Sequence, residues 1–131
     1  MTEQDRIGWS LFSLRLGVFI VMGVWTLDKF FNVDHALGVF EKFYLIPADM
    51  AAPLMMFIAG AEAVLILLFF AGIKKRITYG LVFLFHGVST LSSWQVYLDP
   101  FNNMLFWAAW PMLAACFALY LMRDMDTKFT A

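Results

Sequence analysis

The sequence has little charge, a single cysteine and only two histidines. Of its 131 residues, 15% are charged, and the net charge is -1. There is therefore no basic surface to bind nucleic acid and no long run of one sign to attract a charged partner. Cys116 stands alone, which excludes a disulfide or a CxxC redox or metal motif within one chain. Because His35 and His86 lie far apart along the chain, we expect no metal or haem site.

Apolar residues make up most of the chain. They account for 63% of the residues, and the mean hydropathy is +0.77. A membrane-spanning helix needs about 20 mostly apolar residues. Four segments qualify, approximately 8–31, 51–73, 77–98 and 104–122. We therefore predict an all-α integral membrane protein in which residues 1–131 form one domain, a four-helix bundle; the first segment is too long for a cleaved signal.

Basic residues outside the apolar segments predict the orientation. An even number of spans places both termini on the same side as the connection between spans 2 and 3. That side carries Arg6, Lys74, Lys75, Arg76, Arg123 and Lys128, whereas the other carries Lys29 and Lys42. Positive residues are enriched in cytoplasmic loops, so both termini are predicted to be cytoplasmic.

The connection between spans 1 and 2 has a helical pattern of its own. Val33, Leu37, Phe40 and Tyr44 recur at helical spacing, and proline follows soon after them. We expect a short amphipathic helix on the outer face of the membrane.

Three polar residues fall near the middle of predicted spans, namely Arg15, Glu62 and His86. A charged residue at a helix centre costs about 2.5 to 3.5 kcal/mol, so these residues are expected to turn inward toward one another. One interpretation is a buried Arg15–Glu62 ion pair, completed by His86, that only fixes helix register. The other is a cavity for a small polar or quinone-like ligand, with Glu62 and His86 exchanging protons. A proton or ion pathway is a third interpretation.

Span 3 carries a polar stripe that contains His86. Thr90, Ser93 and Tyr97 lie on the same broad face, and Trp94 falls near the outer end. We include Thr90 and Ser93 in the predicted polar core, and Trp94 and Tyr97, together with Asp28 of span 1, at its outer mouth.

The adjacent pair Asp28 and Lys29 falls at the outer end of span 1. Lys29 shares a helix face with Arg15, whereas Asp28 points about 100° away, toward the amphipathic segment or the turn at Asp99. Either the two charges anchor the helix end, or Lys29 guards the mouth of the polar core and attracts an anionic or carbonyl-bearing ligand. The segment after Leu119 is expected to be a solvated cytoplasmic end.

Several motifs together resemble a known family. They are LRLGVFIVMGVWTLDKFF in span 1, Ile58-Ala59-Gly60-Ala61-Glu62 in span 2, and Ala71-Gly72 before a basic loop. In order and spacing they are similar to DoxX-like small bacterial membrane proteins, over residues 11–122. The resemblance implies a four-helix protein of the bacterial inner membrane, linked to thiosulfate:quinone oxidoreductase and related systems. It matches Arg15, Lys29 and Glu62 and assigns no catalytic residue.

Three functions follow as expectations. The first is an accessory or ligand-binding component of an oxidoreductase or respiratory-type system, with a quinone or small substrate in the polar core and a partner subunit carrying the electrons. The second is a structural or assembly subunit of a larger membrane complex, and the third is a small transporter or proton pathway. Expected partners are the lipid bilayer and either other membrane subunits or further copies of the chain. No redox centre is predicted within the chain itself.

Overall fold

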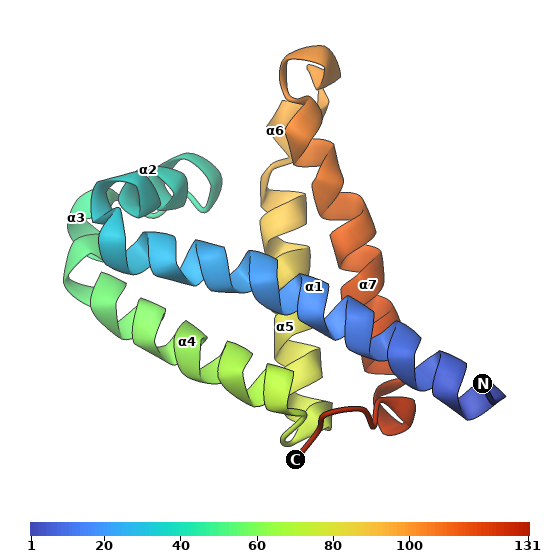
Figure 1. Cartoon of the computed structure of the whole chain (residues 1–131). Coiled ribbons are helices and arrows are strands. Elements are labelled where there is room, and N and C mark those ends of the chain that lie inside the picture. Colours follow the sequence, from blue (N-terminus) through green and yellow to red (C-terminus); the bar gives the residue numbers. More distant parts are fainter.

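The computed structural model describes the whole chain, Met1–Ala131, and its regular elements are helices. Helices account for 84% of the residues, with no strands, which confirms the predicted all-α class. In Figure 1, α1 packs against α4, and α5 packs against α7. These four helices are α1 Glu3–Phe31, α4 Met55–Ala71, α5 Lys75–Ser92 and α7 Ala109–Leu121. The chain therefore forms two helix pairs, which cross each other and join through the connection between α4 and α5.

Short helices occupy the connections. They are α2 Val33–Phe43, α3 Ala48–Ala51, η1 Ala52–Leu54, α6 Trp94–Tyr97, η2 Pro100–Asn102, η3 Met104–Ala108 and η4 Arg123–Met125. The helix predicted between spans 1 and 2 is confirmed as α2. Ala36 and Phe40 of α2 are buried against Ala51 and Met55, so this helix packs onto the start of α4.

Three helical segments are long and apolar enough to cross a membrane, and they support the predicted membrane protein. They are Glu3–Phe31, Ala48–Ala71 and Met104–Leu121, close to three of the expected spans. The expected span 77–98 is not continuous, because α5 ends at Ser92 and α6 begins at Trp94. At this break the Ser93 hydroxyl donates to the Ser89 carbonyl at 3.0 Å. The fourth crossing and the orientation stay predictions.

Local sequence explains how α1 begins and how α4 ends. At the start of α1, Thr2 accepts a hydrogen bond from the Asp5 backbone N–H, and the Asp5 carboxylate accepts one from Thr2, which forms a capping box. At the end of α4, Gly72 adopts a left-handed conformation with φ +72°, and its N–H donates to the carbonyls of Leu68 and Phe69. Glycine adopts this conformation without a Cβ penalty, so the chain can turn sharply toward α5.

The main apolar core lies where the two helix pairs meet. Its most buried members come from all four long helices: Leu11, Val18, Phe69, Tyr79, Val82, Cys116 and Leu119. Large apolar side chains also cover the outside of the molecule, such as Phe57 at 77% exposed and Leu105 at 91%. An apolar exterior of this kind suits hydrocarbon as the solvent, in agreement with the three apolar helices.

Candidate functional site

The polar residues of the helices lie in three separate places. The expected grouping of Arg15, Glu62 and His86 does not form, because each of the three has a different partner. The reason is geometric. Arg15 and Lys29 are four turns apart on the same helix, about 21 Å, so a single carboxylate cannot serve both. Glu62 lies beside Lys29, and Arg15 pairs with another acid.

Arg15 pairs with Asp126, which follows η4. The Nη1–Oδ1 distance is 2.6 Å, and both side chains are fully buried. The other carboxylate oxygen, Oδ2, accepts a hydrogen bond from the Tyr79 hydroxyl at 2.6 Å, and Lys75 donates to the Asp126 carbonyl. We call Arg15, Lys75, Tyr79 and Asp126 the tail anchor. It joins α1, α5 and the end of the chain by charge-assisted hydrogen bonds.

The expectation of a solvated end after Leu119 is therefore wrong. Beyond Asp126, the Arg15 Nη2 group donates to the carbonyls of Lys128, at 2.5 Å, and Phe129, at 3.3 Å. The Ala131 N–H donates to the Ala71 carbonyl at 2.7 Å, so the tail, residues 123–131, returns to the end of α4. A buried guanidinium needs acceptors, and the tail supplies them to Nη1 and Nη2, whereas Arg15 Nε is buried without a partner.

Lys29 and Glu62 form the second polar group. The Lys29 Nζ atom lies 3.0 Å from Glu62 Oε2, and the two side chains are 15% and 14% exposed. The Thr26 hydroxyl donates to Glu62 Oε1 at 2.9 Å. Lys29 therefore lies on the inward face predicted for it. It pairs with Glu62, the acid that was expected to pair with Arg15. Asp28 points the other way, and its Oδ2 atom lies 2.7 Å from Nδ1 of His35 on α2. Asp28 therefore faces the amphipathic segment, which was one of the two directions expected for it, and not the turn at Asp99.

His86 is the centre of the third polar group. The residue is 1% exposed, and its Nε2 atom lies 3.0 Å from the Ala109 carbonyl oxygen. A carbonyl can only accept, so Nε2 carries the proton, and in the neutral ring Nδ1 is an acceptor. Nδ1 is buried and has no hydrogen-bond partner. The Trp25 ring stacks beside the imidazole, with centroids 5.8 Å apart, and is itself 41% exposed.

The other predicted site residues lie near the third group. Thr90 is buried one turn after His86 and donates to the His86 carbonyl at 2.8 Å. The Tyr97 hydroxyl donates to the Thr90 carbonyl at 3.0 Å, whereas Trp94 is 57% exposed. Ser93 occupies the break between α5 and α6. Of the expected polar core, the structure thus brings Thr90 close to His86 and Glu62 close to Lys29; Tyr97, expected at the outer mouth, bonds to Thr90.

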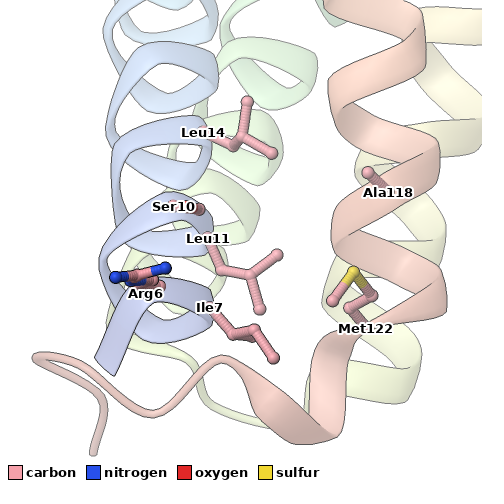
Figure 2. A pocket seen from close by; sticks show the side chains of 7 residues that line it. All are labelled: Arg6, Ile7, Ser10, Leu11, Leu14, Ala118 and Met122. Atoms are coloured by element: carbon pink, nitrogen blue, oxygen red, sulfur yellow. The ribbon is translucent and has the colours of Figure 1, made fainter. Parts of the chain in front are cut away.

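Two of the hollows in the structure lie near the ends of α7 and α4, and neither is lined by a predicted site residue. The first, about 310 Å³, lies between α1 and the end of α7, where Ile7, Leu11 and Leu14 point toward Ala118 and Met122 in Figure 2. The second, about 440 Å³, is rich in basic side chains and lies at the connection between α4 and α5. The cavity expected around Arg15, Glu62 and His86 is therefore not formed by either hollow.

Several residues of these groups were not among the predicted site residues, including Tyr79, Asp126 and Trp25. Asp126 lies in a polar, charged segment that resembles a solvated end. The only signal for it is that Arg15 and Lys29 need two acidic partners, whereas Glu62 can serve only one of them. Trp25 stacks on His86, a contact between α1 and α5 that no local sequence pattern indicates. No group of three His, Cys, Asp or Glu side chains is placed to hold a metal ion.

Comparison with known proteins gave no family assignment. No family model matches the sequence, and no curated protein and no solved structure is significantly similar to it. The DoxX-like resemblance therefore stays a prediction.

Proposed function

We propose that the chain is an accessory membrane component of an oxidoreductase or respiratory-type system and that it binds a quinone in its reduced form, a hydroquinone, beside His86. In this proposal it resides in the bacterial inner membrane, as the DoxX-like motifs imply, and a partner subunit carries the electrons. Four helices cross the bilayer, with both termini in the cytoplasm. Lys75 to Tyr97 measures about 34 Å as a helix, long enough to cross with the break at Ser93.

The unpartnered Nδ1 atom of His86 is the observation that carries this proposal. A buried acceptor without a donor costs about 1 to 3 kcal/mol, so a ligand that supplies a donor is stabilised there. The donor must reach Nδ1, because Nε2 already serves the Ala109 carbonyl. A ring hydroxyl meets this need and also suits the flat, aromatic surroundings.

A hydroquinone has the chemistry that fits. Its hydroxyl can donate to Nδ1 while its ring replaces Trp25 against the imidazole. Trp25 is 41% exposed, so its indole can turn toward the lipid without a change in the backbone. An apolar ligand enters from the bilayer, where it is already concentrated.

Two variants of His86 test this binding. His86→Gln keeps an N–H near the position of Nε2, which can still donate to the Ala109 carbonyl, but it removes the Nδ1 acceptor. We expect it to keep the thermal midpoint of the wild type and to bind decylubiquinol about tenfold more weakly, as for one lost hydrogen bond. Equilibrium dialysis of the purified protein in nonionic detergent measures the affinity.

The comparison with His86→Leu separates binding from folding. This variant removes both nitrogens, so it should lose stability as well as affinity. If His86→Gln binds decylubiquinol as tightly as the wild type, the proposed site is wrong.

The orientation is tested by cysteine labelling in a Cys116→Ser background. Asp99 and Thr127 are both exposed and lie at opposite ends of the proposed bundle. A membrane-impermeant maleimide should label Asp99→Cys in spheroplasts and should label Thr127→Cys only after lysis. The reverse pattern would overturn the orientation.

A structural or assembly subunit is the second candidate, and the pairing of charges within the chain favours it. Arg15 with Asp126 and Lys29 with Glu62 satisfy one another, so their arrangement fixes the helices without any ligand. This role requires a stable partner, either another subunit or a second copy of the chain. If the protein runs alone and monodisperse after mild extraction from its native membrane, the assembly role is refuted. A transporter or proton pathway stays a prediction.

A further inference from the structure

The second hollow gathers basic side chains at one end of the molecule, and we call it the basic hollow. It is lined by Lys74, Lys75, Arg76, Ile77, Arg123 and Asp124. Four of these six residues are cationic and one is acidic. The basic hollow lies where the chain turns between α4 and α5, beside the segment that follows α7. Cations that converge from two parts of the chain are costly to hold together without an anion.

Two cations of the basic hollow, Arg123 and Lys75, are positioned by other contacts. Arg123 donates to the Tyr120 carbonyl at 2.8 Å, and its guanidinium lies over the Tyr120 ring at 4.6 Å. Lys75 donates to the Asp126 carbonyl within the tail anchor. Lys74 adopts a left-handed conformation with φ +52°, which strains a residue with a Cβ. Two of the four cations, Arg123 and Lys75, are thus held at the basic hollow by contacts with the rest of the chain.

The same cations have no acidic partner within the chain. None of the four ion pairs in the structure includes Lys74, Arg76 or Arg123. Asp124 lies in the basic hollow but forms no ion pair, so the space keeps an excess of positive charge. A bound anion would find several donors already in place.

Apolar surface borders the basic hollow. Ile77, which lines it, is 60% exposed, and Leu121, two residues before Arg123, is 61% exposed. Both belong to helices that continue into the apolar part of the molecule. A ligand that fits has an anionic head for the cations and an apolar tail for the helices.

We propose that the basic hollow binds the phosphate headgroup of an anionic phospholipid, whose acyl chains lie along α5 and α7. Basic pockets between membrane helices recognise such headgroups through their charge. A lipid is confined to the bilayer surface, so its effective concentration near the basic hollow is far higher than that of a soluble phosphate. The site is independent of the ligand proposed at His86.

The tail completes this site. Arg123 belongs to the tail, and three residues later the Arg15–Asp126 pair fixes the tail to the bundle. Lipid binding at the basic hollow is therefore coupled to docking of the tail. Loss of the tail anchor should weaken lipid binding even though no residue of the Arg15–Asp126 pair lines the hollow.

Lipid retention tests the proposal. The full chain in nonionic detergent is mixed with phosphatidylglycerol or phosphatidylcholine of identical acyl chains, and bound lipid is counted by native mass spectrometry. The wild type should retain phosphatidylglycerol in preference. Each basic residue at a membrane surface contributes about fivefold in affinity, so Lys74→Gln with Arg76→Gln should weaken phosphatidylglycerol binding roughly tenfold to thirtyfold and leave phosphatidylcholine unchanged.

Two further variants separate the site from general charge and from misfolding. Lys42→Gln removes an exposed lysine on α2, outside the basic hollow, and should have no effect. Asp124→Asn removes the repelling acid and should strengthen phosphatidylglycerol binding, a gain that a misfolded protein would not show. Equal retention of the two lipids, or wild-type affinity in the double variant, overturns the proposal. Inorganic phosphate that displaces the lipid where chloride at equal ionic strength does not would identify a site for free phosphate and overturn the lipid assignment.

Discussion

Removal of the Asp126 carboxylate should cost this small protein a large part of its stability. The Arg15–Asp126 pair is fully buried on both sides, with 2.6 Å between Nη1 and Oδ1. At that distance and an effective dielectric constant of 20, the attraction is about 6 kcal/mol, from which the desolvation of both ions must be subtracted. Asp126→Ala leaves the Arg15 guanidinium without its anion and the Tyr79 hydroxyl without its acceptor. We expect a loss of about 3 to 5 kcal/mol in the free energy of unfolding.

Asp124→Ala is the matched control. Asp124 belongs to the same short segment, but it is exposed and forms no ion pair. This variant should change the free energy of unfolding by no more than about 0.5 kcal/mol. Unfolding is followed by far-ultraviolet circular dichroism in mixed micelles of nonionic detergent and increasing dodecyl sulfate. If Asp126→Ala is as stable as Asp124→Ala, the tail does not hold the bundle together and the reasoning fails.

A double-mutant cycle separates the ion pair from other effects of the substitution. Arg15→Met with Asp126→Leu removes both charges and leaves apolar side chains of similar length. The double variant should lose less free energy of unfolding than the two single variants lose together, by at least about 2 kcal/mol. Additive losses would show that the two residues act independently.

Three further predictions concern other parts of the chain. Glu62→Gln neutralises the partner of Lys29 in a site that is about 14% exposed, and should lower the free energy of unfolding by about 1 to 3 kcal/mol, measured in the same mixed micelles. Gly72→Ala adds a Cβ at φ +72° and should cost about 1 to 2 kcal/mol, whereas Gly17→Ala, which has open space around its Cβ, should be neutral or stabilising. Cys116 is 1% exposed and should resist maleimide until the protein is unfolded, as a mass-spectrometric time course would show.

Hydropathy and spacing were enough to predict most of the helices. A membrane helix needs only a long apolar run, and such runs at 8–31, 51–73 and 104–122 correspond to segments that the structure finds long and apolar enough to cross. The short helix after α1 was also predictable, because Val33, Leu37 and Phe40 recur on one face. The break at Ser93 was not, because neither glycine nor proline stands at that position to indicate the end of a helix.

Partners of buried charges were harder to predict than the helices. Arg15 and Asp126 are 111 residues apart in sequence, and nothing in the local pattern of either residue points to the other. A count of charges would have helped. Arg15 and Lys29 share one face of α1 about 21 Å apart, so two acids are needed, and Glu62 can serve only one of them. The second acid had to come from outside the predicted spans, and Asp126 supplies it.

The distribution of strong and weak contacts suggests where the molecule can move. At one end, the tail anchor joins α1, α5 and the tail through buried, charge-assisted bonds. Farther along α1, the contact of Trp25 with His86 is a ring stack, which is weaker than an ion pair and leaves the indole 41% exposed. Motion of the indole therefore costs less than motion of the anchored end. The buried Nδ1 atom that lacks a partner belongs to the His86 ring, on which this indole stacks, so the binding proposed at His86 requires only the weaker of these contacts to open.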